Sequence, residues 1–185
     1  MHSLRFLLPH EHKKYASWLK CQDADTLNIY FGYTITSESI DALVSNILKE
    51  NDHHFIVVEN EKLEWIGTCH IVHCYNNEIE LGLMISKDQR KKGIGGQMLE
   101  KALVWCQNRG YSDIYLHCLS RNEAIIHLVK KYGLKTTNSY GETDAKIHLD
   151  NPTPVSWYKE WYQTSAQVWQ YWRMRTRQWY NQLPQ

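Results

Sequence analysis

Residues 89–96 combine glycines with positive charge between an expected strand and an expected helix. The segment reads Gln-Arg-Lys-Lys-Gly-Ile-Gly-Gly, after an apolar run at 78–85 and before apolar residues at helical spacing. Glycine lets a backbone turn tightly and lie against a ligand. The N-terminus of a helix attracts anions, because its first N–H groups lack partners within the helix. The segment therefore predicts a cradle for a pyrophosphate group.

Three kinds of glycine-rich loop can form such a cradle. The spacing of a Walker loop is absent. A Rossmann fingerprint needs a third glycine where Met98 stands, and Asp113, at about the right distance to bind a ribose, begins the next expected strand instead of ending one. The remaining form, Arg/Gln-x-x-Gly-x-Gly, is met by Arg90, Gly93 and Gly95. A plain strand-to-helix turn with solvated lysines is the alternative for this segment alone.

A second segment adds to the glycine loop. Residues 112–119 alternate like a strand, and Asn122 then begins a helical pattern that ends in Gly133 and Leu134. The order of strand, glycine loop, helix, strand and Asn-led helix resembles the core of the GNAT superfamily of acyl-CoA N-acyltransferases. The resemblance covers residues 55–135, with Leu134 where the family pattern has Phe.

The resemblance implies both a fold and an activity. The fold is α/β, with a mixed, strongly twisted central sheet flanked by helices. The activity is that of an acetyl-CoA-dependent N-acetyltransferase, which uses acetyl-CoA as co-substrate and a primary amine of a small molecule or peptide as acceptor. A non-catalytic acyl-CoA-binding or assembly module is the alternative.

The resemblance also implies which residues hold the cofactor. In the superfamily, backbone groups of the strand before the loop pair with the pantetheine and bind the oxyanion, while the loop holds the pyrophosphate. The cofactor-binding residues expected on this basis are Leu83, Met84, Ile85, Arg90, Lys91, Lys92, Gly93, Ile94, Gly95, Gly96 and Asn122.

N-acyl transfer needs a group that takes a proton from the attacking amine. Glu80 lies two residues before Gly82 on the strand that meets the cofactor, and Glu78 lies on the same nominal face. His117 lies on the next strand, five residues before Asn122, where some relatives carry a general-base Glu, and histidine titrates near neutral pH. Glu80 and His117 are the preferred pair. The structural alternatives are a solvated strand edge and a hydrogen-bonded core histidine.

The usual proton donor of the family is missing. Many relatives place a tyrosine seven residues after the Asn to protonate the leaving thiolate, but Val129 stands there, and Tyr132 follows one helical turn later. Three explanations remain: a thiolate that leaves unassisted, a donor from another segment, or no catalysis.

Two cysteines and two histidines lie within one six-residue stretch. On a strand, His70 and Cys74 face one way and Cys69 and His73 the other. The four side chains therefore do not converge on a zinc ion, and no metal site is expected. The paired histidines at 53–54 are expected at the surface.

The remaining elements follow from hydrophobic spacing and turn residues. We expect strands at 4–8, 54–58, 65–75, 136–140 and 145–149, helices at 10–20 and 37–50, and a loop at 22–36.

Pro152 and Pro154 mark a boundary between a GNAT-like domain at 1–150 and a Trp-rich helical extension at 151–185. The extension holds five of the eight tryptophans, namely Trp157, Trp161, Trp169, Trp172 and Trp179. We expect a helix over 155–182 whose tryptophan face is buried on its own domain or on a second subunit, which favours a homodimer. A substrate-covering element and a membrane-interface helix are the alternatives.

Composition agrees with a cytoplasmic enzyme. The 185 residues are enough for one domain, and a net charge of +1 argues against a general nucleic-acid binder. No stretch is apolar enough to span a membrane, and the first residues are too weakly apolar for a secretory signal. The five cysteines are odd in number and contain no Cys-x-x-Cys pair, which favours reduced thiols.

Overall fold

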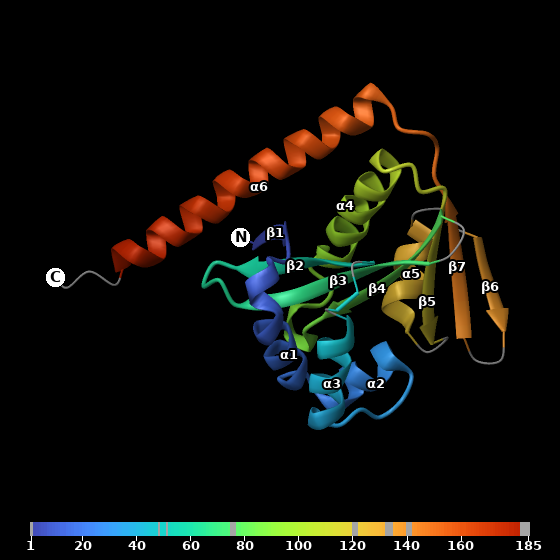
Figure 1. Ribbon diagram of the computed structural model, residues 1–185, viewed down its shortest axis with the longest axis horizontal. Helices are drawn as coiled ribbons and strands as arrows, with labels where there is room; N and C mark the ends of the chain where they lie inside the picture. Colours follow the sequence, from blue (N-terminus) through green and yellow to red (C-terminus); the bar gives the residue numbers. More distant parts are fainter. Residues whose placement is uncertain are drawn as a thin grey trace.

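A seven-stranded mixed sheet forms the centre of the computed structural model, in the order β1-β2-β3-β4-β5-β7-β6 (Figure 1). Its strands are β1 (His2–Phe6), β2 (His53–Asn60), β3 (Trp65–His73), β4 (Glu78–Ile85), β5 (Asp113–Leu119), β6 (Lys135–Ser139) and β7 (Glu142–His148). Among the described strands, only β4 and β5 pair in parallel. The structure describes residues 2–47, 49–50, 52–74, 77–119, 122–131, 135–139 and 142–181.

Helices cover both faces of the sheet (Figure 1). They are η1 (Pro9–Glu11), α1 (His12–Lys20), α2 (Ala24–Phe31), α3 (Ser37–Ile47), η3 (Lys87–Gln89), α4 (Ile94–Asn108), α5 (Glu123–Lys131) and α6 (Pro154–Asn181). The side chains of a strand alternate between faces, so β2 contributes to two cores. Ile56 and Val58 pack with α4 and α5, whereas Phe55 and Val57 pack with α1, α2 and α3.

Strand β4 pairs with its two neighbours over very different lengths. β3 pairs with β4 over seven residues of each strand, from Gly67–His73 to Ile79–Ile85. β5 pairs with β4 over three residues, and the last pair joins Glu80 to Tyr115. Within the described residues, the β5-facing edge of β4 beyond Glu80 therefore has no partner strand. Backbone groups on that edge can receive a ligand in extended conformation.

The composition of residues 22–36 led us to expect a loop. This expectation is wrong, because the segment contains α2. Asp23 caps the helix, because its Oδ1 accepts a hydrogen bond from the Thr26 N–H at 3.0 Å. Gly32 ends the helix in the left-handed conformation, with φ of 80°, and its N–H donates to the Asn28 carbonyl. The Asp and Gly signals flank only eight residues, and the mixed polar and aromatic content between them conceals the helical spacing.

Most other elements agree with expectation. The hairpin of β2 and β3, the strands β4 to β7 and the helices α1, α3 and α6 all form at or close to the predicted positions. The first strand is β1, two residues earlier than the predicted 4–8, because Pro9 begins η1 and Leu8 is its N-cap. The predicted helix at 37–50 ends at Ile47, and residue 48 lies outside the described residues.

Helix α6 crosses the side of the molecule next to α4 and β1, and it attaches there through polar side chains (Figure 1). Glu160 accepts hydrogen bonds from Asn108 at 2.6 Å and Arg109 at 3.0 Å. Farther along, Gln167 accepts a hydrogen bond from Lys101 at 2.5 Å. The side of α6 that faces the domain is therefore mainly polar, and Met174 is buried on it as well.

The tryptophans of α6 point the other way. Trp157, Trp161, Trp169 and Trp172 are 55%, 63%, 73% and 60% exposed, respectively. The expectation that this face is buried on its own domain is wrong, because α4 offers polar partners and the helix turns its polar side towards them. The side chain of Trp179 lies outside the described residues. Among the described helices, none combines the length and the apolar character needed to cross a bilayer.

Candidate active site

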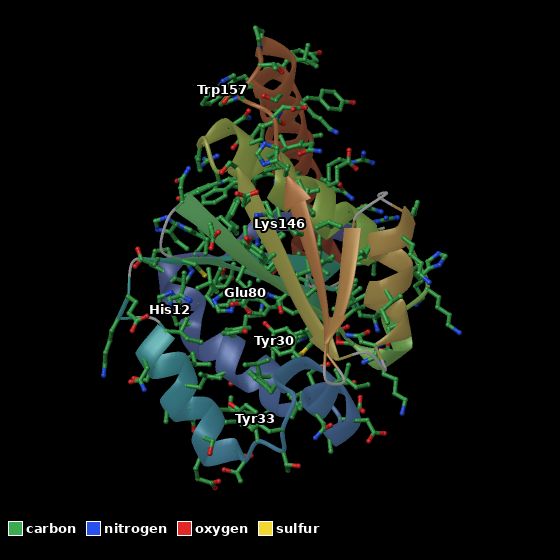
Figure 2. All side chains as sticks on the ribbon, turned by 90° about the vertical axis from the view of Figure 1, so that its right-hand side faces the viewer. His12, Tyr30, Tyr33, Glu80, Lys146 and Trp157 are labelled. Atoms are coloured by element: carbon green, nitrogen blue, oxygen red, sulfur yellow. The ribbon has the colours of Figure 1, made fainter. Side chains whose placement is uncertain are left out.

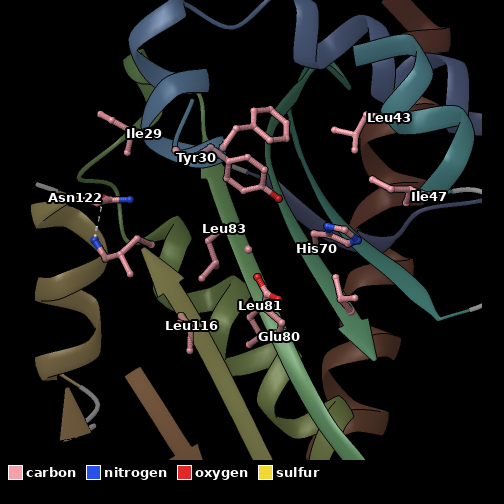
Figure 3. A pocket seen from close by; sticks show the side chains of 15 residues that line it. Ile29, Tyr30, Leu43, Ile47, His70, Glu80, Leu81, Leu83, Leu116 and Asn122 are labelled. Atoms are coloured by element: carbon pink, nitrogen blue, oxygen red, sulfur yellow. Dashed lines mark hydrogen bonds between the residues drawn. The ribbon is translucent and has the colours of Figure 1, made fainter. Parts of the chain in front are cut away.

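A cavity of about 380 Å³ lies where β4 and β5 part, below α2 and α3 (Figure 3). Polar groups from three elements meet there: Tyr30 from α2, His70 from β3 and Glu80 from β4. Gly82 of β4 and Asn122, which precedes α5, also line the cavity. A mostly apolar hollow with a few convergent polar groups is the usual form of a small-molecule site.

The sheet register brings Glu80 and His70 to one face. Val72 pairs with Glu80, and His70 pairs with Gly82. Directly paired residues share a face, so Glu80 and His70 are diagonal neighbours across β3 and β4. Both side chains point into the cavity (Figure 3). Glu80 therefore lies where a base could reach a ligand in the cavity, and its catalytic role stays a prediction.

Tyr30 closes the cavity over Gly82. A Cβ atom at Gly82 would lie 2.7 Å from the hydroxyl oxygen of Tyr30 and 3.2 Å from its ring, so only glycine admits this contact. Burial raises the pKa of Tyr30 well above its ordinary value, and its interactions with Tyr15, Cys69 and Glu80 act in the same direction. The hydroxyl group therefore keeps its proton and can act as a hydrogen-bond donor.

His70 is neutral in the folded protein. Burial lowers its pKa to about 3, and the charge of His53 contributes. The ring of His70 stacks on Phe55 with centroids 4.2 Å apart, and its Nε2 lies 2.8 Å from Nδ1 of His53. His53, expected at the surface with its neighbour, is partly buried and hydrogen-bonded instead, because the β2–β3 register places it beside His70. The neighbouring His54 is exposed, as expected.

The glycine loop has the backbone shape of an anion site. Lys91 and Gly93 both adopt the left-handed conformation, with φ of 61° and 76°. Among the described residues, no atom lies within 4 Å of a Cβ built on Gly93. The N–H of Gln97 donates to the carbonyl of Gly93, the N-cap residue, so the N–H groups of Ile94 and Gly95 lie in the first turn of α4. This arrangement suits a phosphate group.

The basic side chains of the loop have different partners. The guanidinium of Arg90 donates to the Thr26 hydroxyl at 2.5 Å and to the Ile85 carbonyl at 3.2 Å. Arg90 therefore joins the loop to α2 and to the end of β4. Lys92 donates to Gln89 at 2.9 Å, and Lys91 is exposed.

The other predicted cofactor residues surround the cavity or support it. Leu83 lines the cavity, Met84 is buried among α1, α2 and α3, and Ile85 ends β4. Asn122 begins α5, because its carbonyl accepts the Ile125 N–H and its Oδ1 lies 3.4 Å from the same group. Gly96 lies in the first turn of α4.

Some predicted residues cannot be placed. His117 lies in β5, where its backbone pairs with that of Asp144 in β7. Its side chain lies outside the described residues, so its role stays a prediction. Tyr132, Gly133 and Leu134 also lie outside them. Val129 is fully buried in the core beside α4, where it packs and has no proton to donate.

Sequence reasoning missed Tyr30 and His70 as cavity residues. Tyr30 lies in the segment expected to be a loop, and the Asp23 cap and Gly32 were the available signals of a helix there. His70 was weighed only as a zinc ligand. Its position opposite Gly82 depends on the pairing of β3 with β4, which a short hairpin sequence does not fix in advance.

The chain belongs to the acetyltransferase (GNAT) family, whose profile matches residues 13–134. This match covers more than half of the chain and includes α2, the glycine loop and Asn122. A comparison with curated protein sequences finds no match.

Solved structures share the fold at low sequence identity. A spermidine N-acetyltransferase from Vibrio cholerae, solved with CoA and spermine, has a TM-score of 0.64 and 17% identity, over 80% of this chain and 95% of that one. The GNAT domain of S. lividans PAT has a TM-score of 0.67 and 14% identity, over 79% and 89%. A GNAT-family acetyltransferase from Streptococcus pneumoniae has a TM-score of 0.63 and 17% identity, over 81% and 100%. The fold is the GNAT fold.

Proposed function

We propose that the protein is an N-acetyltransferase that moves the acetyl group of acetyl-CoA to a primary amine of a small molecule or peptide. The observation that carries the proposal is the cavity at the parting of β4 and β5, which holds Glu80 and is lined by residues of β4, the strand that precedes the glycine loop. Family membership supports acetyl transfer, and the similar structure from Vibrio cholerae was solved with CoA and a polyamine.

Each part of the site has a task in this proposal. Acetyl-CoA supplies the activated thioester. The loop around Gly93 binds the pyrophosphate, because it joins left-handed backbone to the N-terminus of α4. The edge of β4 beyond Glu80 pairs with the pantetheine. Glu80 removes the ammonium proton, directly or through water. Tyr30, which keeps its proton, donates a hydrogen bond that stabilises the leaving thiolate, an interaction that Val129 cannot provide.

We also propose that the exposed face of α6 is a contact between two copies of the chain. Four tryptophans and two tyrosines on this helix are between 55% and 73% exposed. Because an aromatic side chain can bury about 150–250 Å², they offer on the order of 700 Å². A standard interface needs about 800 Å² from each partner. Figure 2 places Trp157 at the end of the molecule remote from Tyr30 and Glu80, which argues against a substrate cover.

The proposal includes the division of the chain and its location. Residues 1–150 form the acetyltransferase domain, and residues 151–185 form an extension whose helix serves assembly. Four cysteines in the described part of the chain are free thiols, which supports the reducing cytoplasm.

The test is the release of CoA thiol from acetyl-CoA in the presence of polyamines, aminoglycosides, amino acids or peptides. Release that depends on one class of amine supports the proposal and identifies the acceptor. Tight acetyl-CoA binding without release by any of them favours the alternative, an acyl-CoA-binding or assembly module.

A further inference from the structure

Three side chains form a hydrogen-bonded row between the cavity and the surface. Nε2 of His70 lies 2.8 Å from Nδ1 of His53, and Nε2 of His53 lies 3.0 Å from Oε2 of Glu50. Both nitrogens of His53 are thus engaged, one on each side. Each imidazole nitrogen can donate or accept according to the tautomer, so the row can transmit a proton in either direction.

The two ends of the row lie in different surroundings. His70 lines the cavity together with Glu80. The backbones of diagonal neighbours in a sheet are about 7–8 Å apart, which is within reach of long side chains, so a water molecule in the cavity can bridge the two polar groups. At the other end, the Glu50 side chain is 67% exposed. The row therefore begins beside the proposed base and ends in solvent.

We propose that His70, His53 and Glu50 form a proton relay that carries the proton of the acceptor amine from the cavity to solvent. This inference rests on the proposed function. Amide formation releases one proton for each amine acylated, and the site must discharge it before the next turnover. Glu80 takes that proton first, and the relay returns Glu80 to its carboxylate form.

The transfer conserves protons at each ring. A proton arrives at Nδ1 of His70 through water, while the proton on Nε2 of His70 passes to Nδ1 of His53. The proton on Nε2 of His53 then passes to the Glu50 carboxylate and on to bulk water. Each ring gains one proton and loses one, and both rings exchange tautomers. The reverse exchange or a ring flip restores them.

The environment of His70 disfavours a lasting imidazolium, so a proton that reaches the ring is passed on. The titratable groups around His70 are His53 from β2, Tyr30 from α2 and Glu80 from β4. Burial disfavours an imidazolium, and a protonated His53 would repel it. The hydrogen bond to His53 uses Nε2 of His70. Within the described part of the chain, Nδ1 of His70 has no hydrogen-bond partner, so a water molecule can bind it.

The sequence offers a matched pair of variants for the test. His53→Phe keeps a ring beside His70, whose centroid is 5.0 Å away, but removes both nitrogens. His54→Phe changes the next residue, which points to the opposite face and contacts Trp105. We expect His53→Phe to lower kcat at least tenfold with unchanged KM for acetyl-CoA, and added imidazole to restore part of the rate. His54→Phe keeps the wild-type kcat. A wild-type kcat and pH profile in His53→Phe would overturn the relay.

A second measurement separates the relay from the proposed function. If the wild-type protein releases no CoA with any amine, the proposed function fails. Long-range ¹H–¹⁵N spectra of the free protein then test the row itself. We expect Glu50→Gln to shift the ring nitrogens of both His53 and His70, because they share one hydrogen-bonded row. A change confined to His53 would show that no connection to the cavity exists.

Discussion

The hydroxyl oxygen of Tyr30 lies 2.7 Å from the position that a Cβ atom at Gly82 would occupy. This contact joins α2 to β4 directly above Glu80, so the roof and the floor of the cavity meet at a residue without a side chain. The cavity walls therefore depend on glycine at this position for a reason of space, since Gly82 lies in a strand and has no left-handed backbone.

Gly82→Ala should lower the free energy of unfolding by about 1–3 kcal/mol, the usual cost of overpacking. Urea denaturation measures the change. Tyr30→Phe removes the nearest atom, so the double variant should recover part of the lost stability. Equal losses in the single and the double variant would mean that the contact does not limit the space at Gly82.

Gly93→Val should weaken acetyl-CoA binding at least tenfold, which corresponds to about 1.4 kcal/mol. The new side chain would occupy the open side of the loop and strain a backbone whose φ is 76°. Gly110→Val is the control, because Gly110 follows the other end of α4 with φ of 78°. Calorimetry should find wild-type affinity in Gly110→Val. Similar affinities in both variants would remove the loop from the cofactor site.

Glu80→Gln should abolish the acid limb of the pH–rate profile. If Glu80 accepts the amine proton, the wild-type rate falls at low pH because the base is lost on protonation, and the variant has no such step. Glu78→Gln is the matched control, since Glu78 binds the Tyr115 hydroxyl at 3.1 Å. His117→Ala tests the other predicted base in the same way. If all these variants keep the limb, the titration of the amine itself sets the profile.

Lys101 should make stability rise with pH. Burial lowers its pKa to about 8 from 10.5, so the unfolded chain binds more protons than the folded one between these values. The free energy of unfolding therefore gains a contribution that grows from about pH 8 to pH 10.5. Comparison with Lys101→Met isolates this gain. Lys159→Met, at an exposed ion pair with Glu100, should keep the wild-type pH dependence.

Removal of residues 155–185 should reduce the molecular mass in solution from that of a dimer to that of a monomer. Replacing Trp161 and Trp169 by Gln should do the same with α6 retained, because both rings are exposed and the polar anchors stay. Analytical ultracentrifugation measures the masses. A full-length monomer that binds anionic vesicles would show that α6 lies on a membrane surface instead.

Much of the fold follows from local patterns in the sequence. The glycine loop, the strand before it and the Asn-led helix were recognisable because each has a pattern that is complete within about ten residues. The amphipathic helix α3 was recognisable for the same reason.

What could not be predicted depends on partners far away in the sequence. The orientation of α6 was mispredicted because its polar side finds Asn108 and Lys101, about 50 and 66 residues earlier. The role of His53 depends on His70 in another strand. Glu80 was singled out by its place two residues before Gly82 on the expected cofactor strand; it lines the cavity, and its catalytic role stays a prediction.

The three-residue pairing of β4 with β5 divides the sheet into two parts, or leaves: β1 to β4 on one side, and β5, β7 and β6 on the other. This short pairing is the seam between them. A molecule that lies along β4 past Glu80 would extend that seam and join the leaves over a greater length. A ligand at 100 times its dissociation constant adds about 2.7 kcal/mol to the stability of the protein it binds. Amide hydrogen exchange should therefore slow in both leaves when acetyl-CoA is present. Among the described residues, the edge of β4 beyond Glu80 has no partner strand, and a ligand bound there would act as a structural part of the sheet.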